Sequence, residues 1–394
     1  MHVVAFIAGV FCCLGVALDA FQTIILPRRP NGRFRITRLF FLATWGPWVA
    51  MAEHARDKKV REQIYSVYGP LSLLLLLLLW ALLLICGFGL FYFSMRQLPF
   101  GDVMIGQSAS AWAQLGTDLY VSGTTLFTLG LGDVVPHSRL ARALIILESG
   151  VGLGFVALVI GYLPVLYQAF SRREVSVALL DSRAGSPPNA AELFRRHAFE
   201  GGHEALTALL AEWERWAAEL LESHISYPIL CYYRSQHDTQ SWLSALVSIL
   251  DTCSLLISVI EGPPSRQAQL TFVMARHALV DLGNVFHVQE REAWQHQAEV
   301  DRLPSKDFYH LCDALGDNHL LLCGDPAAAK RLNTIRVLYE PHAVALSEYL
   351  RMPLPVWVAP PKLNDQWSIL TKMRTDAELA LKVRSDQSAS YQDE

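Results

Sequence analysis

The sequence predicts an all-α integral membrane protein that continues into a helical C-terminal domain. Hydrophobic residues make up 52% of the 394 residues and the mean hydropathy is positive, which is typical of a membrane protein with a water-exposed part. Several apolar runs reach the roughly 20 residues that a helix needs to cross a bilayer. Beyond residue 190, apolar residues recur at the 3.6-residue spacing of amphipathic helices.

The first apolar run predicts a membrane helix. Residues 1–26 are almost entirely apolar, with Asp19 as their one acidic residue. They lack the short apolar core and small-residue cleavage site of a signal peptide. The following loop is basic and holds no acidic residue, which places it in the cytoplasm by the positive-inside rule. Its arginines are Arg28, Arg29, Arg33, Arg35 and Arg38.

Residues 39–52 are apolar but short, are interrupted at Gly46-Pro47 and have basic residues on both sides. We therefore interpret them as an interfacial or re-entrant elbow, which completes an N-terminal region of residues 1–62. The alternative is a second membrane span, which would place the arginine loop outside the cell.

Two further spans follow. Residues 63–95 carry no charge and include seven consecutive leucines, so 65–95 is predicted to be a lipid-facing helix. Residues 139–171 form the next one, and Arg172-Arg173 mark its cytoplasmic end. Basic residues also precede the helix at 65–95. The basic ends of both helices are in the cytoplasm only if the residues between the two helices face outward. The first span then begins outside the cell.

A short predicted helix at 111–127 and a glycine-containing stretch lie between these two spans. The stretch reads Thr128-Leu129-Gly130-Leu131-Gly132-Asp133. A backbone that turns several successive carbonyl groups the same way alternates between ordinary and positive-φ conformations, and glycine adopts positive φ at little cost. Gly130 and Gly132, one residue apart, fit this alternation.

This stretch and its setting resemble the selectivity filter of the tetrameric potassium channel family. The resemblance covers a pore module of residues 63–173, with an outer helix at 65–95, a pore helix and filter at 111–136 and an inner helix at 139–171. It implies that backbone carbonyls of residues 128–133, with the Thr128 hydroxyl, replace the water shell of a potassium ion. One filter per chain then implies a homotetramer.

Two residues depart from the family pattern. Leu131 stands where the family most often has an aromatic residue, and Phe127 stands where many members have a second threonine. An aromatic residue at the first position can brace the filter against its pore helix. A weakly selective cation channel is therefore an alternative to a potassium-selective one.

The inner helix carries the candidate gate. Gly152 lies where the resemblance places a hinge glycine, and Pro164 removes a backbone hydrogen bond near the inner end. A face of the helix that lines the pore would form an apolar constriction able to close by dewetting, although plain helix packing is an alternative for it. That face holds Leu153, Val156, Ile160 and Pro164.

Glu148 is a carboxyl group within the inner helix. Because a charge at mid-membrane is costly, we expect it to face protein rather than lipid. Its place behind the pore loop predicts hydrogen bonds to pore-helix hydroxyl groups that support the filter. Those hydroxyls belong to Ser122, Thr124 and Thr125.

The remaining chain is interpreted as a linker at 174–189 and a helical cytoplasmic domain at 190–394. Asn189 suits the N-cap of a helix beginning at Ala190. Residues 242–260 come closest to a further span, but Asp251 lies inside them. A last amphipathic helix is predicted at 364–384.

This domain does not reveal what it senses. There is no G-x-G-x-x-G after a strand, so the nucleotide-binding domain common on bacterial potassium channels is not expected. His277 and Asp281 have a spacing that can chelate a metal, but no third ligand of defined spacing accompanies them, and no metal is predicted. Four aromatic residues are predicted to be core rather than a ligand cage. They are Tyr227, Tyr232, Tyr233 and Trp242.

We therefore expect a homotetrameric potassium channel in the plasma membrane, gated at the inner helix and regulated by its cytoplasmic domain. Its partners would be the lipid bilayer and potassium ions, with no cofactor, nucleic acid or enzymatic activity. The seven cysteines form no C-x-x-C pair, which fits a reducing compartment for the water-exposed part. Besides the weakly selective channel, a non-conducting membrane sensor or scaffold acting through the C-terminal domain is an alternative.

Overall fold

The computed structural model describes residues 2–26, 35–95, 100–101, 110–197, 201–237, 240–259, 263–286, 301–304, 307–309, 311–312 and 326–358. The chain divides into two compact units. The membrane unit comprises Met1–Ser171 and Ser223–Arg234, and the C-terminal unit comprises Arg172–Glu222 and Ser235–Glu394. The arginine loop at 28–34 and the helix predicted at 364–384 lie outside the described residues.

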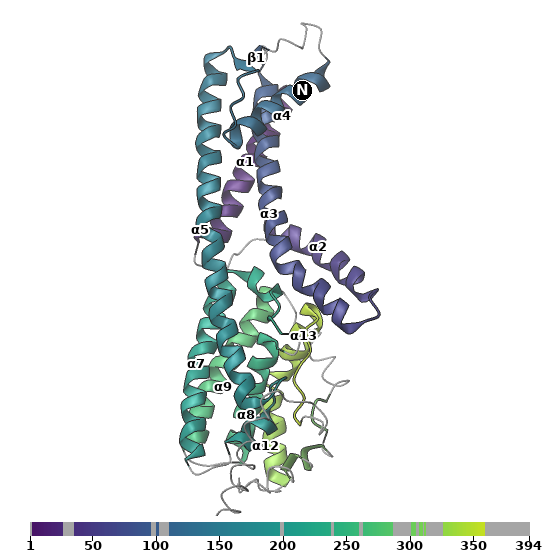
Figure 1. The fold of residues 1–394 in the computed structure, drawn as a ribbon, viewed down its shortest axis with the longest axis vertical. Coiled ribbons are helices and arrows are strands. Elements are labelled where there is room, and N and C mark those ends of the chain that lie inside the picture. Colours follow the sequence, from purple (N-terminus) through teal and green to yellow (C-terminus); the bar gives the residue numbers. More distant parts are fainter. Residues whose placement is uncertain are drawn as a thin grey trace, which may run out of the picture. The chain divides into compact units, whose positions relative to one another are not determined.

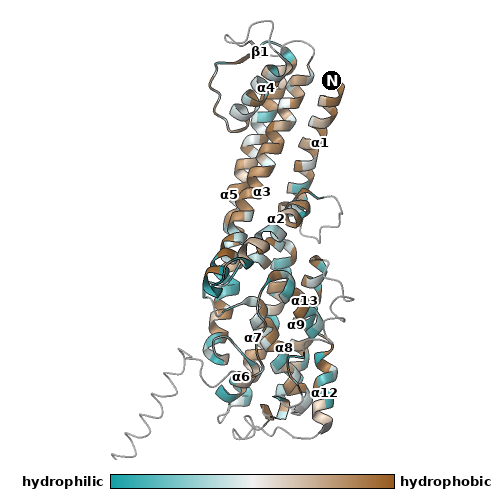
Figure 2. Ribbon diagram, turned by 90° about the vertical axis from the view of Figure 1, so that its right-hand side faces the viewer, coloured by the Kyte–Doolittle hydropathy of each residue, from teal (hydrophilic) through white to brown (hydrophobic). Residues whose placement is uncertain are grey.

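Among the described residues, three helices are long and apolar enough to cross a membrane. They are α1 (His2–Ala20), extended by η1 (Phe21–Ile25), then α3 (Lys58–Ser94) and α5 (Arg139–Ala184). Figure 2 shows α1, α3 and the adjacent part of α5 as mostly hydrophobic ribbons. The predicted all-α membrane architecture is therefore confirmed.

Helices α1 and α3 run antiparallel. His2 Nδ1 lies 3.1 Å from the carbonyl oxygen of Phe93, at the end of the membrane unit that also carries α4 (Ala111–Leu126) (Figure 1). Farther along, a Cβ on Gly9 would lie 2.7 Å from the Gly87 carbonyl oxygen. Small residues permit this close approach of helices within a membrane.

The acidic residue of the first span has partners on α3 and at the start of the helix that follows the first span. Asp19 is 4% exposed and accepts hydrogen bonds from Trp80 Nε1 of α3 at 3.0 Å and from the Thr37 amide at 2.9 Å. Arg35 Nε lies 3.6 Å from its other oxygen. A buried carboxylate needs such partners in an apolar setting, so Asp19 fixes where α2 (Ile36–Glu53) begins.

The stretch predicted as an elbow is the helix α2, and it is not interrupted. Pro47 lies within the helix rather than ending it, so the expected break at Gly46-Pro47 is wrong. Trp48 Nε1 donates to the Ile64 carbonyl at 3.0 Å, and the Thr44 and Tyr68 hydroxyls are 2.9 Å apart. These contacts hold α2 against the first turns of α3, and Figure 1 shows the two running together at an angle to the rest of α3. Helix α2 is not among the candidate spans in the described part of the chain.

The segment between α3 and α5 holds the region predicted to form the pore. Helix α4 begins at Ala111, where the Ser110 side chain accepts a hydrogen bond from the Ala113 amide. Short strands β1 (Phe100–Gly101) and β2 (Val135–Pro136) pair antiparallel, with Phe100 opposite Pro136. This pairing ties the residues that follow the stretch 128–133 to the segment before α4.

The C-terminal unit is built around one apolar helix, α8 (Trp242–Val259). Almost all of its side chains are buried, and it packs against α6 (Ala190–Arg196), α9 (Pro263–Val285), α12 (Pro326–Arg336) and α13 (Glu340–Leu350). The Thr271 hydroxyl donates to the Leu210 carbonyl at 2.9 Å, which joins α9 to α7 (Gly202–Ser226). Helix α8 is thus apolar because it is a core helix.

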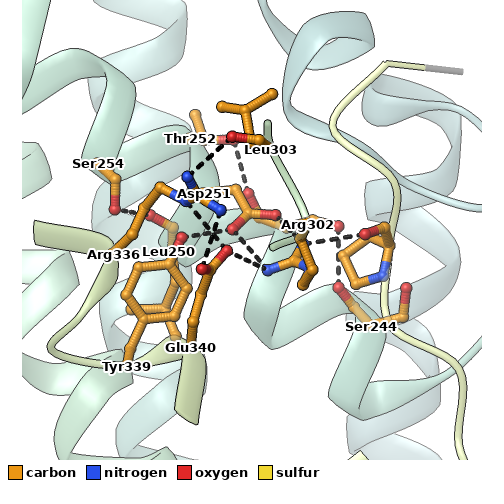
Figure 3. A network of polar contacts seen from close by, with 12 residues as sticks. Ser244, Leu250, Asp251, Thr252, Ser254, Arg302, Leu303, Arg336, Tyr339 and Glu340 are labelled. Atoms are coloured by element: carbon orange, nitrogen blue, oxygen red, sulfur yellow. Dashed lines mark hydrogen bonds and ion pairs between the residues drawn. The ribbon is translucent and has the colours of Figure 1, made fainter. Parts of the chain in front are cut away.

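The charged residue of α8 is neutralised by a buried ion network (Figure 3). Asp251 receives both Nη atoms of Arg302, at 3.2 and 2.6 Å, and the Tyr339 hydroxyl at 2.5 Å. Glu340 joins through Arg302 Nη1 at 3.2 Å and Arg336 Nη2 at 3.0 Å. Burial acts to lower the pKa of Arg302, but Asp251, with Tyr339 and Glu340, outweighs burial and holds that pKa above its ordinary value.

Two predicted boundaries differ from the structure. Helix α5 continues to Ala184, so most of the expected linker 174–189 is helical. Asn189 caps α6 through a 2.9 Å hydrogen bond from the Glu192 amide, as predicted. Residues 223–234, expected in the C-terminal domain, belong to the membrane unit. Their side chains pack there, which sequence periodicity does not reveal.

Candidate functional site

Helix α4 ends in a tight C-terminal turn that starts the glycine-containing stretch. The Thr128 amide donates to the Thr125 carbonyl at 2.9 Å, and the Leu129 amide donates to the Thr124 carbonyl at 2.7 Å. This pair of bonds defines a Schellman motif, whose left-handed position is usually glycine. Here Thr128 takes that position with φ of 57°. A β-branched residue at positive φ is unusual and strained.

Positive φ then recurs at every second residue. Gly130 has φ of 52° and Gly132 has φ of 77°, whereas Leu129 and Leu131 are not in the positive-φ region. This alternation turns successive peptide groups so that a row of carbonyls can face one side. The sequence predicted it for the two glycines but not for Thr128, because no composition signal marks a strained threonine.

The stretch is not covered by the rest of the chain. Leu129 is 62% exposed and Leu131 is 63% exposed. A Cβ placed on Gly130 or Gly132 would have no heavy atom within 4 Å. The two leucine side chains and the space beside the two glycines are therefore open in the single chain.

A hydrogen bond from the pore helix anchors the far end of the stretch. The Tyr120 hydroxyl donates to Asp133 Oδ2 at 2.7 Å. Tyr120 lies on α4, so the bond spans from the helix to the last of the predicted filter residues. Tyr120 was not predicted from the sequence, in which only its place thirteen residues before Asp133 connects the two residues.

Glu148 joins all three elements of the pore module. Its Oε1 accepts a hydrogen bond from the Ser122 hydroxyl of α4, and its Oε2 accepts one from the Tyr92 hydroxyl of α3, both at 2.5 Å. Glu148 and Ser122 are each 0% exposed, so the carboxyl group faces protein. Ser122 was one of the three hydroxyls expected there, and Tyr92 was not foreseen.

The two threonines grouped with Glu148 have other surroundings. The Thr124 hydroxyl donates to the Val121 carbonyl at 3.0 Å, within its own helix. Thr125 contributes its backbone carbonyl to the turn at Thr128. Both therefore shape the end of α4 near the filter stretch, whereas Ser122 is the hydroxyl that meets Glu148.

The pore helix also holds a buried carboxyl group. Asp118 is 1% exposed, and its Oδ2 has no hydrogen-bond partner in the described part of the chain. No role was predicted for Asp118 from the sequence. Its burial follows from the packing of α4 against α3, which a single sequence does not show.

The inner-helix residues occupy two different sides of α5. Gly152 is buried against α4, and a Cβ there would lie 2.0 Å from the Leu126 carbonyl oxygen. The predicted gate face points away from the rest of the chain, with Leu153 65% and Ile160 67% exposed. Val156 and Pro164 are exposed too. Helix α5 is continuous through Gly152 and Pro164.

The weaker candidates of the C-terminal unit are ordinary side-chain pairs or core. His277 Nε2 lies 3.5 Å from Asp281 Oδ2, and no group of three or more possible metal ligands occurs among the described residues. Trp242 is buried in the C-terminal unit. Tyr227, Tyr232 and Tyr233 lie instead in the membrane unit.

Comparison with known proteins agrees with this geometry. Residues 78–168 match the model of a family described as "Ion channel", and these residues contain the C-terminal part of α3, all of α4 and much of α5. The chain is also 26% identical over 271 residues to the "Uncharacterized membrane protein YdjJ" of Bacillus subtilis (strain 168), covering 68% of this chain and 73% of that protein. No solved structure matches the chain significantly.

Proposed function

Starting from an ion channel domain at residues 78–168 in a membrane protein, we propose that this chain is one subunit of a homotetrameric, potassium-selective channel. Its selectivity filter is residues Thr128–Asp133. The channel is gated at the inner helix and regulated by the C-terminal domain.

The observation that carries the proposal is the alternating backbone of the filter stretch. Positive φ at Thr128, Gly130 and Gly132 suits a row of carbonyl oxygens that replaces the hydration shell of a dehydrating cation. The C-terminal end of α4 adds to cation preference, because a helix carries partial negative charge at that end.

Four copies follow from the number of filters. A ring of carbonyl oxygens around one axis needs several filter strands, and this chain carries one. The exposure of Leu129 and Leu131 supports a filter that meets copies of itself. So does the exposed apolar face of α5 at Leu153, Val156 and Ile160, which suits the lining of an inner cavity that closes by dewetting.

The orientation follows from charge. Basic residues at Lys58, Lys59 and Arg61 precede the apolar part of α3, and Arg172-Arg173 follow that of α5. By the positive-inside rule these ends are cytoplasmic and the filter faces outward. We place the protein in the plasma membrane with its C-terminal domain in the cytoplasm.

A second candidate is a weakly selective cation channel. Leu131 is 63% exposed and carries no hydroxyl or ring with which to brace the filter against α4. In this channel Tyr120 would brace the stretch through Asp133 without an aromatic side chain at Leu131, and a less rigid ring would discriminate less between potassium and sodium.

Purified full-length protein in proteoliposomes separates these candidates. We expect a crosslinked tetramer in detergent and a reversal potential that follows the potassium gradient when potassium and sodium gradients are opposed. A reversal potential near zero would favour the weakly selective channel. Absence of current from a protein that crosslinks as a dimer would contradict the proposal and favour the sensor or scaffold.

A further inference from the structure

A short stretch of chain leaves the C-terminal unit and packs into the membrane unit. Ser223–Arg234 belongs to the membrane unit, while the residues on both sides of it belong to the C-terminal unit. It contains the last turn of α7 and the short helix η2 (Pro228–Tyr232). Ile229 and Leu230 are 5% and 0% exposed, in the same hydrophobic cluster as Trp80. We call this stretch the docking segment.

Tyr232 of the docking segment enters an aromatic cluster formed by α2 and α3. Its ring stacks on Phe41 with centroids 5.3 Å apart and planes 6° apart. It also meets Trp45 and Tyr68 at centroid distances of 5.0 and 5.3 Å, in edge-on geometry. Offset-stacked and edge-on arrangements are the favourable ones for aromatic pairs, so Tyr232 makes a specific packing contact with α2 and α3.

The end of the docking segment is held by charge and by close packing. The Arg234 guanidinium lies 4.9 Å above the Tyr65 ring, and its Nε is 3.9 Å from Glu62 Oε2. The Tyr233 ring lies so close to α3 that a Cβ on Gly69 would be 2.7 Å from it. A glycine at 69 is therefore what leaves room for Tyr233.

The same segment contacts the inner helix before and after Pro164. Tyr227 meets Tyr162 edge-on at a centroid distance of 5.6 Å, and Tyr233 meets Phe170 at 5.7 Å. Tyr162 precedes the proline by two residues and Phe170 follows it by six. Proline is the weakest point of a helix because it removes a backbone hydrogen bond.

We infer that the docking segment is the coupling element through which the C-terminal unit controls the inner helix. This inference rests on the proposed function, because it takes α5 to be the gate. Helix α7 runs without a break from the C-terminal unit into the segment, so a displacement of that helix along its axis moves Tyr227. The segment then shifts the balance between two conformations of α5 by contacting each differently.

A pair of glycine variants tests this in the full-length protein. Gly69→Ala forces the Tyr233 ring outward without changing the docking segment itself, whereas a Cβ on Gly46 of the neighbouring helix α2 meets no atom within 4 Å. Both substitutions favour helix to the same degree, so Gly46→Ala is the matched control. Hydrogen exchange at residues 228–233 reports release of the segment, and single-channel recording reports open probability.

We expect Gly69→Ala to speed exchange in the segment and to change open probability on the order of fivefold or more, which is the usual scale of coupling between sites. The potassium-to-sodium reversal potential should stay at the wild-type value, and Gly46→Ala should match the wild type in every measurement. If exchange does not change because Tyr233 is accommodated, Tyr232→Ala must produce the same change in open probability.

The inference is overturned if both Gly69→Ala and Tyr232→Ala open as often as the wild type. That result would leave the proposed function intact, because the wild-type channel would still conduct. A wild-type protein that passes no current would instead contradict the proposed function, and the inference with it.

Discussion

Gly152 of the inner helix lies directly against the end of the pore helix, where a Cβ would come within 2.0 Å of the Leu126 carbonyl oxygen. The contact requires a glycine for space, whatever flexibility it also lends to α5. Leu126 is the last residue of α4 and stands two residues before the filter stretch. Packing at Gly152 therefore positions the end of α4, from which the proposed filter stretch continues.

Gly152→Ala should accordingly destabilise the assembled protein, by about 1–3 kcal/mol per chain as expected for overpacking. Gly150 and Gly154 lie nearby on α5, and a Cβ on either meets nothing within 4 Å, so Gly150→Ala and Gly154→Ala are the controls. Thermal melting of the purified protein measures the difference. Equal melting temperatures for all three variants would show that the contact with Leu126 is easily relieved.

Replacing either filter glycine should abolish selective conduction. In Gly130→Ala and Gly132→Ala a Cβ occupies a positive-φ residue, at a cost of roughly 1–3 kcal/mol each. The same strain in every subunit would deform a ring of filters. Gly116 lies on α4 at ordinary φ with open space around it, so Gly116→Ala should conduct normally. Reversal potentials under opposed potassium and sodium gradients measure the selectivity of each variant. Wild-type currents in both Gly130→Ala and Gly132→Ala would exclude this stretch as the ion path.

Thr128 has a positive φ, and we propose that a threonine occupies this strained position because its hydroxyl contacts the ion. Thr128→Gly should relieve roughly 1–3 kcal/mol of positive-φ strain, which exceeds the roughly 0.5–1 kcal/mol that glycine costs in the unfolded chain. The variant should therefore melt slightly higher but lose potassium selectivity, while Thr128→Ser should keep the selectivity. A Thr128→Gly protein that remains fully selective would mean that the hydroxyl does not contact the ion.

Glu148 and Tyr92 should be energetically coupled. A buried hydroxyl left without its partner costs about 1–3 kcal/mol, so Glu148→Ala and Tyr92→Phe should give a coupling energy of roughly 0.5–3 kcal/mol in a double-mutant cycle. Ser66 lies near the other end of α3 and bonds only locally to the Gln63 carbonyl. The stability losses of Tyr92→Phe and Ser66→Ala should therefore add in the double variant. If the losses of Tyr92→Phe and Glu148→Ala also add, the hydrogen bond that joins α3 to α5 contributes no coupling energy, which would contradict this prediction.

The buried ion network of the C-terminal unit should dominate its stability. Arg302→Ala leaves Asp251 buried without its cation and removes one of the two arginines that contact Glu340, and breaking a buried pair typically costs about 3–5 kcal/mol. Arg195 pairs with Glu192, and its side chain is 45% exposed. Arg195→Ala should therefore lower the free energy of unfolding by less than about 1 kcal/mol. Denaturant unfolding of the full-length variants measures both. If Arg302→Ala and Arg195→Ala lower the free energy of unfolding by similar amounts, rearrangement of the remaining residues compensates for the loss of Arg302.

Local sequence determined the membrane helices and the filter glycines. An uncharged run such as 63–95 has no stable place except lipid or a protein core, and glycines at 130 and 132 mark backbone positions where side chains are disfavoured. These features depend on neighbours along the chain. They could therefore be predicted from residue type and spacing alone.

Tertiary structure decided which residues meet across elements. Tyr92 and Glu148 are 56 residues apart and Tyr120 was indistinguishable from any helix residue until Asp133 was placed beside it. The docking of Tyr232 between α2 and α3, and the packing of Gly152 on Leu126, likewise depend on helix positions that periodicity does not encode. Spacing determines which face of a helix a side chain occupies, whereas only packing determines what that face meets.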